Sequence, residues 1–153
     1  MYTQDHRNIG IVVAERPKDI LLLNAFEGVE GVSRLFAYEF TALSEQALNP
    51  ADMLGCKASF WVVREDGERR HVNGVITRFA YRGPCRENPE LHDYSATLEP
   101  LLALSQRSKR YRVFRDKSAL DIIRAILREW DVDFNDDAVD KTQIFPMDQH
   151  VQY

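Results

Sequence analysis

The segment from Glu27 to Phe40 reads EGVEGVSRLFAYEF and predicts a connection followed by a strand of an antiparallel sheet. Its second half alternates strictly, with the aromatic side chains of Phe36, Tyr38 and Phe40 on one face, because successive side chains of a strand leave opposite faces. Aromatic residues at a period of two are typical of a half-buried strand. Residues 20–26 (ILLLNAF) form a second strand candidate directly before this segment.

Two glycines, Gly28 and Gly31, lie between the two apolar runs. Glycine reaches backbone angles closed to other residues, so a tight or bulged connection is expected here. Glu27 and Glu30 are three positions apart, a spacing that could suggest a carboxylate pair for acid–base chemistry, but a solvated turn explains them more simply. The Phe36 ring is expected on the inner face of the barrel, so its truncation to alanine should lower the free energy of unfolding by about 3 to 5 kcal/mol.

Further strands are predicted from alternating or β-branched runs. They lie at residues 58–64, 69–81, 94–99 and 110–114, with one edge strand within residues 1–18. An Asp-Gly pair at positions 66 and 67 indicates a hairpin turn between the first two. One face of the strand at 69–81 carries Val75, Thr77, Phe79 and Tyr81. The other face, expected to be wet or to contact a partner, carries Ile76, Arg78, Ala80 and Arg82.

Cap chemistry and a change of period predict two helices. Asn49 can cap a short helix, Pro50 suits its first position, and Gly55 can take a left-handed exit. Residues 101–106 form a helical turn. From Ser118, which with Asp121 resembles a capping box, the apolar positions follow helical spacing. The apolar face of this second helix comprises Leu120, Ile123, Ile126, Leu127 and Trp130. A lone helix of this length is marginal, so it must dock on another element.

The bulk composition indicates a soluble globular chain. Its 153 residues fit one domain, or one domain plus the start of another. The charge balance of 20 − 24 = −4 argues against nucleic acid or an anionic membrane as the main partner. No apolar run approaches the roughly 20 residues that span a bilayer, and no signal peptide is expected. Cys56 and Cys85 are predicted to be reduced structural thiols.

Candidate chemistry is sparse. Phosphate-binding loops, dinucleotide fingerprints, zinc-protease motifs and nucleophile elbows are all missing from the sequence. Cys85 and His92 share a polar loop and could ligate a metal, but structural zinc usually needs four ligands. Either cysteine could in principle be a nucleophile with a distant histidine, which is less favoured still. We therefore predict no catalytic residue, no metal site and no cofactor.

The segment Arg107–Lys117 (RSKRYRVFRDK) is the sharpest charge feature, with six cations and one aspartate. Its interleaved Tyr111 and Phe114 could stack bases on a small barrel, as in single-strand binders. Alternation places Arg110 and Arg112 on one side of a short strand and Tyr111 on the other. This pattern favours a solvated face or a protein contact over nucleic-acid binding.

Several ordered pieces of the sequence together carry a family resemblance. They are Leu22, Ala25, Phe26, Gly28, Glu30, Gly31, Ser33, Phe36 and Tyr38; then Leu54-Gly55, Asn73-Gly74-Val75-Ile76, Tyr94 to Pro100 with Leu101-Leu102, Phe114 with Ser118 and Asp121-Ile122-Ile123, and Phe145-Pro146 to Val151-Gln152-Tyr153. In this order they resemble the N-terminal region of the VgrG family, found at the tip of bacterial type VI secretion systems. The resemblance covers about residues 18–153.

The resemblance implies a mainly β fold with short helices (α+β), an antiparallel β-barrel like the phage T4 baseplate hub. Residues 1–115 would form the first hub-like barrel, and residues 116–153 a connecting amphipathic helix and the incomplete start of a second barrel. It also implies a structural, non-enzymatic role: the N-terminal hub of a spike protein that caps the tube of a contractile injection machine and helps deliver effectors.

The partners implied by the resemblance are two further copies in a homotrimer of the full-length protein, the ring of the tube protein (Hcp), a spike-tip protein, effectors and baseplate components. Nucleic acid and a membrane span are not expected. Assembly would occur in the bacterial cytoplasm, followed by secretion or injection. Two alternatives stay open: the hub of a phage-like tail, and a small barrel that binds single-stranded nucleic acid or a peptide through Arg107–Lys117.

Overall fold

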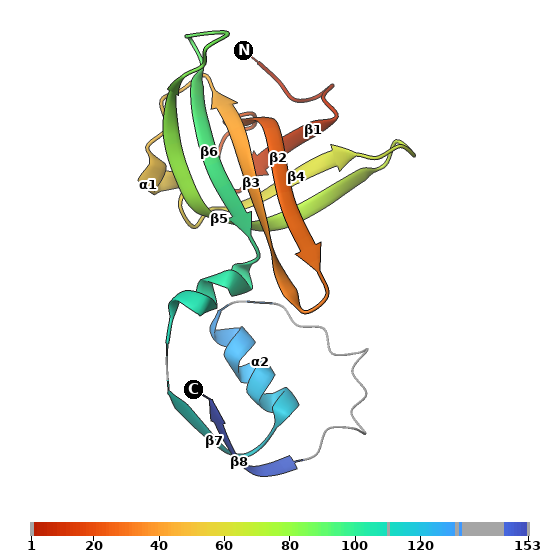
Figure 1. The fold of residues 1–153 in the computed structure, drawn as a ribbon, viewed down its shortest axis with the longest axis vertical. Helices are drawn as coiled ribbons and strands as arrows, with labels where there is room; N and C mark the ends of the chain where they lie inside the picture. Colours follow the sequence, from red (N-terminus) through yellow and green to blue (C-terminus); the bar gives the residue numbers. More distant parts are fainter. Residues whose placement is uncertain (1, 110, 131, 133–145, 153) are drawn as a thin grey trace. The chain divides into compact units, whose positions relative to one another are not determined.

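The chain divides into two compact units, Met1–Pro100 (unit 1) and Leu101–Tyr153 (unit 2). The computed structural model describes residues 2–109, 111–130, 132 and 146–152. The division comes earlier in the chain than the boundary predicted after residue 115. It falls where the last strand of unit 1 ends and a 3-10 helix begins (Figure 1).

Unit 1 is a curled antiparallel sheet with one short helix. Its elements are β1 (Ile9–Val13), β2 (Leu22–Gly31), β3 (Arg34–Ser44), α1 (Pro50–Met53), β4 (Lys57–Val63), β5 (Arg69–Pro84) and β6 (His92–Glu99). The six strands follow the order β1-β4-β5-β6-β3-β2. The first half of β5 pairs with β4 and its second half with β6, so this long curved strand bends the sheet into a half-barrel (Figure 1). The predicted mainly β, antiparallel fold is confirmed.

Aromatic rings fill the inner side of the half-barrel. The rings of Phe26 and Tyr38 lie 4.7 and 5.0 Å from that of Phe60, which is fully buried. Phe40 is buried too, as the alternation predicts. Phe36 packs against this core but remains half-buried, so we now expect its truncation to cost less than about 3 to 5 kcal/mol. A loss of that size is expected for the fully buried Phe60.

The hairpin between β2 and β3 turns later than predicted. β2 runs to Gly31, which pairs with Arg34, so Val32 and Ser33 form the turn and Ser33 takes φ +57°. The predicted tight or bulged connection is confirmed, because the two-residue turn follows a register shift between Val29 and Gly31, but neither glycine of this segment has a positive φ. Gly28 is needed for another reason: a Cβ there would lie 2.3 Å from Cδ1 of Tyr38 on the neighbouring strand.

A bulge in β5 changes which side chains face the core. Ile76 pairs with Leu98 and Arg78 pairs with Thr97, so Thr77 is an extra residue between them. The extra residue shifts the alternation by one position. Ile76 is fully buried in the core, and its predicted place on the wet face was therefore wrong. Arg78 is exposed, as predicted.

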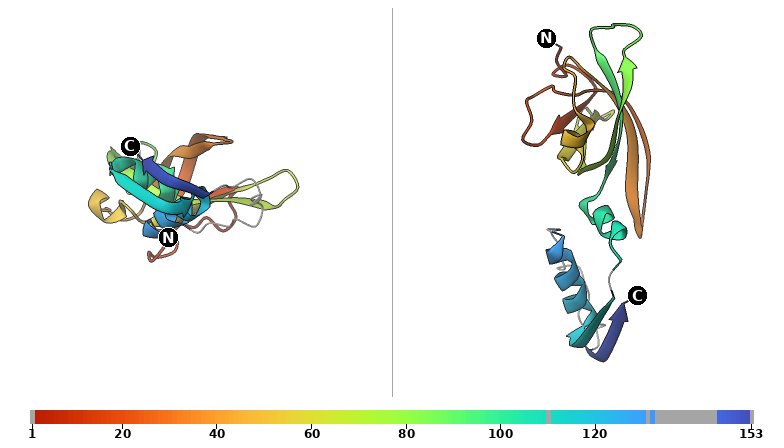
Figure 2. Two further views of the ribbon diagram at one scale, coloured as in Figure 1. Left: turned by 90° about the horizontal axis from the view of Figure 1, so that it is seen from below. Right: turned by 90° about the vertical axis from the view of Figure 1, so that its left-hand side faces the viewer.

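A buried glutamine joins the two edge strands of the half-barrel. The side-chain amide of Gln4 donates to the carbonyls of Ile11 in β1 and Leu21 beside β2, at 3.0 and 2.9 Å. Its oxygen accepts from the N–H groups of Ile11 and Leu23, both at 2.9 Å. The right-hand view of Figure 2 shows β2, β3 and β6 as one wall, with β1 and α1 on the other side. The predicted edge strand is confirmed as β1, but residue 4 is firmly held rather than frayed.

Unit 2 comprises η1 (Leu101–Arg107), β7 (Arg112–Ser118), α2 (Ala119–Glu129) and β8 (Pro146–Gln152). β7 and β8 pair antiparallel. The predicted cap is confirmed, because the Asp121 N–H donates to Ser118 Oγ at 3.2 Å. Of the predicted apolar face of α2, Leu120 is buried, Ile126, Leu127 and Trp130 are half-buried, and Ile123 is exposed. Phe145 and Tyr153, the ends of the last piece of the resemblance, lie outside the described residues.

The caps predicted around α1 are also present. The Asn49 side chain accepts the Ala51 N–H at 3.2 Å, Pro50 opens the helix, and Gly55 has φ +79°. The Gly55 N–H then donates to the carbonyl of Ile76 at 2.8 Å, which ties the end of α1 to β5. Local capping therefore fixes where the chain leaves β3 and enters β4.

Candidate interaction surfaces

The residues suggested for metal binding or nucleophilic chemistry do not form a site in the described part of the chain. Cys85 follows β5, and its N–H donates to the Leu91 carbonyl at 2.7 Å. The ring of His92 faces the Tyr81 hydroxyl, with Nδ1 and the oxygen 3.4 Å apart. No group of three or more His, Cys, Asp or Glu side chains among the described residues could hold a metal ion. Cys56 and Cys85 are both free thiols.

The glutamates of β2 are separated by the pleat. Glu30 forms an ion pair with Arg70 of β5, and hydrogen bonds from Arg70 and Tyr38 hold the pKa of Glu30 below its ordinary value. Burial, with the Glu30 contact, raises the pKa of Tyr38. Glu27 lines a groove with Glu39, whereas Glu30 is bound to Arg70, so Glu27 and Glu30 do not act as a carboxylate pair. The predicted turn was wrong for Glu27 and Glu30, since both lie within β2 and Glu30 ties two hairpins together, but both are exposed as predicted.

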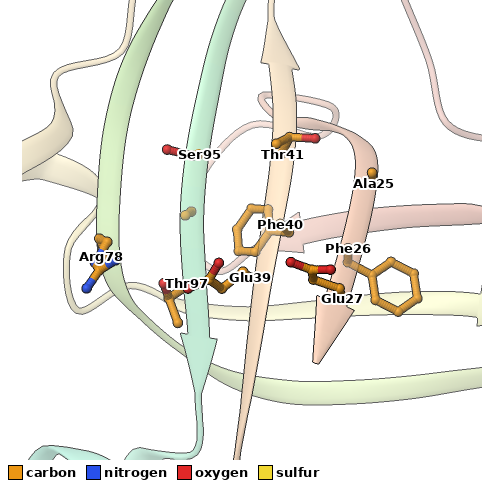
Figure 3. A pocket seen from close by; sticks show the side chains of 10 residues that line it. Ala25, Phe26, Glu27, Glu39, Phe40, Thr41, Arg78, Ser95 and Thr97 are labelled. Atoms are coloured by element: carbon orange, nitrogen blue, oxygen red, sulfur yellow. The ribbon is translucent and has the colours of Figure 1, made fainter. Parts of the chain in front are cut away.

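A row of polar side chains crosses the outer face of the sheet. Glu27 is directly opposite Glu39, Glu39 is opposite Thr97, and Thr97 is opposite Arg78. These four residues line a shallow groove of about 300 Å³ (Figure 3). Like charges directly opposite each other destabilise a sheet. Neither carboxylate of the row forms an ion pair with any residue the structure describes.

Sequence reasoning placed Glu39 on the outer face of its strand but missed this row. Alternation alone assigns each side chain to a face, whereas the row depends on how four strands are aligned. Charged residues at outward positions of several strands were the available signal. The register that brings Glu27 against Glu39 follows from the Val32–Ser33 turn together with the register shift between Val29 and Gly31.

The basic segment Arg107–Lys117 is partly engaged within unit 2. Arg112 forms two hydrogen bonds of 2.6 Å with the carboxylate of Glu129, which ties β7 to α2. Lys117 lies over the ring of Phe114, 5.9 Å from its centre. Tyr111 is 87% exposed. Arg112 therefore contacts protein, whereas Tyr111 lies before β7, whose span Arg112–Ser118 differs from the predicted 110–114. Arg110 lies outside the described residues.

None of the helices in the described residues is long and apolar enough to cross a bilayer. The described surface has an open strand edge beside the groove lined by Glu27 and Glu39, and an exposed hairpin tip. Val32 at that tip is 99% exposed and Val29 is 55% exposed. Exposed apolar side chains beside unpaired charges are features of partner-binding surfaces.

Comparisons with known proteins identify relatives of the whole arrangement. The family model of the phage tail baseplate hub (GPD) matches residues 29–153. Two type VI secretion system spike proteins of Pseudomonas aeruginosa, VgrG1b and VgrG1a, are 34% and 33% identical over 119 and 111 residues. These alignments cover 77% and 72% of this chain but only 15% and 17% of the relatives, so the chain spans a small part of their length.

A solved structure has the same fold. The E. coli c3393 protein, described as a type VI secretion component similar to the T4 tail proteins gp27 and gp5, superposes with a TM-score of 0.74 at 23% identity. The match covers 94% of this chain and 38% of that protein. At this identity the likeness speaks for the fold alone.

Proposed function

The chain belongs to the phage tail baseplate hub (GPD) family, and we propose that it forms the hub part of a type VI secretion spike. The match of the family model to residues 29–153 is the observation that carries the proposal. In this role the chain caps the tube of a contractile injection machine and helps deliver effectors. The spike proteins VgrG1b and VgrG1a, which match most of the chain, favour a type VI machine over the hub of a phage tail.

The construction of unit 1 suits a part that transmits force. Work in such a machine comes from contraction elsewhere, so a hub needs rigidity and interfaces rather than a reactive group. Rigidity comes from the stacked rings around Phe60 and from cross-links between hairpins, such as Glu30 with Arg70. A role without catalysis is consistent with the relatives, which are named as spike proteins.

We assign unit 1 to the first hub-like barrel, and unit 2 to the connecting helix and the start of a second barrel. The boundary would then lie at Pro100 rather than after residue 115. Among the described residues, β7 and β8 pair only with each other, and with the helix capped at Ser118 they fit an element that continues a larger sheet. The proposed partners are two further copies of the protein, the tube-protein (Hcp) ring, a spike-tip protein, effectors and baseplate components.

The test uses the intact protein and the 153-residue chain side by side. Sedimentation should give a mass of about three copies for the intact protein, because closed cyclic symmetry is expected for a hub, and one copy for the chain alone. Tube protein should co-purify with the intact protein. A monomeric intact protein at micromolar concentration, or no retention of tube protein, would contradict the proposal. Assembly in the cytoplasm followed by secretion is tested by fractionating cells with and without a functional sheath.

A further inference from the structure

The gap between the two edge strands of the half-barrel holds a slot shaped for a primary amide. β1 and β2 lie at opposite ends of the strand order and do not pair with each other in the described sheet. The N–H groups of Ile11 and Leu23 converge on one oxygen, Gln4 Oε1, both at 2.9 Å. The carbonyls of Ile11 and Leu21 and a carboxylate oxygen of Asp19 surround the amide nitrogen Nε2, at 3.0, 2.9 and 3.1 Å. These groups form the carboxamide slot, and they use both acceptor positions and both N–H donors of the amide.

The carboxamide slot discriminates against groups of similar shape. A carboxylate would bring negative charge against two carbonyl oxygens and Asp19, and it has no N–H to donate. An apolar group would leave the N–H groups of Ile11 and Leu23 without an acceptor, which is costly inside a protein. Gln4 is 1% exposed, so these polar groups depend on its amide rather than on solvent. The slot therefore specifies a primary amide.

Gln4 enters the slot from a segment that lies at the surface. This segment, residues 2–8, is termed the N-terminal strap, and all its other residues are exposed or half-buried. Asp5 is paired with Lys18 at 2.7 Å, but the two side chains are 55% and 67% exposed. An ion pair as exposed as this adds little stability. Apart from Gln4, the strap therefore buries no side chain in the core, and segments of this kind open locally at low cost.

The two ends of the strap are held differently. Near the N-terminus, Tyr2 contacts Glu45 and Asn88 through its backbone N–H and its hydroxyl, and these contacts are exposed. At the other end, the Asn8 carbonyl accepts the Val63 N–H of β4 at 2.7 Å, directly before β1 begins. Asn8 is therefore a fixed point, and the strap can leave the slot without pulling β1 from the sheet.

We propose that the N-terminal strap detaches while unit 1 stays folded, and that the open carboxamide slot binds other primary amides on aliphatic chains. A glutamine side chain of another polypeptide has this chemistry. Detachment opens the half-barrel between β1 and β2 and uncovers Leu21 and Leu23, which are 1% and 0% exposed when Gln4 is in place. The proposal goes beyond the hub role and does not depend on it, because every group of the slot lies in unit 1.

Hydrogen exchange of the native 153-residue chain tests whether the strap detaches. The amides of Ile11 and Leu23 should exchange at least about tenfold faster than those of β4, through an opening that exposes little surface and that low urea concentrations do not promote. Within β1, the amides of Gly10 and Val12 should stay protected, because alternate N–H groups of an edge strand point to its neighbour, here β4. The proposal is overturned if Ile11 and Leu23 open only with β4, or if Gly10 and Val12 exchange together with Ile11.

Chemical rescue tests the specificity of the slot. Gln4→Ala in the full chain empties the slot, and added propionamide should slow exchange at Ile11 and Leu23 about tenfold once its concentration reaches about ten times its Kd. Propionate and N,N-dimethylpropionamide should change the exchange less than about twofold, because neither offers an N–H to the slot. If Gln4→Ala is unfolded by itself, propionamide should restore its folding transition and propionate should not.

Gln46→Ala is the matched control, because Gln46 is exposed and lies outside the slot. In this variant, exchange at Ile11 and Leu23 should respond to none of the three compounds. Melting curves check that each variant folds. Protection of Gln4→Ala by propionate as strong as by propionamide, or no protection by propionamide up to about 1 M, would overturn the amide-specific slot.

Discussion

Replacing Gln4 with leucine should open the half-barrel between β1 and β2. The Gln4 side chain is 1% exposed and makes four hydrogen bonds to backbone groups of the two edge strands. Leucine is apolar and somewhat larger than glutamine, so the change removes the polar contacts without creating a large cavity. It leaves the N–H groups of Ile11 and Leu23 without the acceptor they share.

The magnitude follows from these two donors. A buried donor left without a partner costs about 1 to 3 kcal/mol, so two of them predict a loss of about 2 to 6 kcal/mol. The carbonyls of Ile11 and Leu21 also lose a donor, but an unsatisfied carbonyl is tolerated better than an unsatisfied N–H. We therefore expect unit 1 to unfold at clearly lower denaturant concentration in Gln4→Leu than in the native chain.

The assay follows urea unfolding by the fluorescence of Trp61, which lies in β4 and is 8% exposed. A Trp130→Phe background removes the only other tryptophan, so that the signal reports on unit 1. Gln46→Leu makes the same chemical change at an exposed position and serves as the control. Native-state hydrogen exchange should show the amides of Ile11 and Leu23 losing protection selectively.

Two results would refute the reasoning about Gln4. One is a loss of stability below about 1 kcal/mol, the level of a single ordinary hydrogen bond. The other is a loss no larger than that of Gln46→Leu. Gln4→Asn adds a check on geometry: its amide is one methylene shorter and cannot reach both Ile11 and Leu23 in their present positions, so most of the loss should persist.

Three further predictions concern Gly28 in the β2–β3 hairpin, the Glu30–Arg70 ion pair and the basic segment Arg107–Lys117. Gly28→Ala should lower the free energy of unfolding by about 1 to 3 kcal/mol, because its Cβ would collide with the Tyr38 ring and the Ala37 carbonyl. Gly31→Ala should be nearly neutral in urea unfolding, because the nearest atom to its Cβ would lie at 3.9 Å. Equal effects of the two variants would refute the packing argument. Arg70→Ala should lower the melting temperature at neutral pH. The pKa of Glu30 is depressed in the folded chain, so the stabilisation by the Glu30–Arg70 pair is present above the ordinary pKa of 4.5 and disappears as pH falls through the lower folded pKa. A difference in melting temperature between Arg70→Ala and the native chain that persists at about pH 2 would contradict this argument. Labelled single-stranded DNA should show no salt-dependent binding up to about 100 μM chain, and steeply salt-dependent micromolar binding would revive a nucleic-acid role for Arg107–Lys117.

Much of the local structure follows from near neighbours in the chain. Tyr38 and Phe40 lie inside because alternation is a property of one strand, and the Ser118 cap forms because its partner is three residues away. The resemblance to a hub family likewise rested on ordered short motifs, and the family match agrees with it. Pattern reasoning is reliable where the interacting groups are separated by a fixed, short spacing.

The failures at Ile76 and Glu30 involve groups that are distant in sequence. Ile76 was placed on the wrong face because the bulge at Thr77 depends on how β5 is shared between β4 and β6. The Glu30–Arg70 ion pair was missed because Arg70 is forty positions away and comes close to Glu30 only in the folded sheet. Neither the bulge nor the ion pair leaves a local pattern.

The amino-acid sequence by itself determined the strands, the caps, the inward aromatics of the segment that begins at Glu27, and the family to which the chain belongs. Only the tertiary structure decided which strand edges are closed and which charges meet. Gln4 closes the sheet at one end of β2, and Glu27 faces Glu39 along the end that stays open. The physical reason is that periodicity sets the direction of a side chain, whereas its partner is set by strand register and sheet curvature.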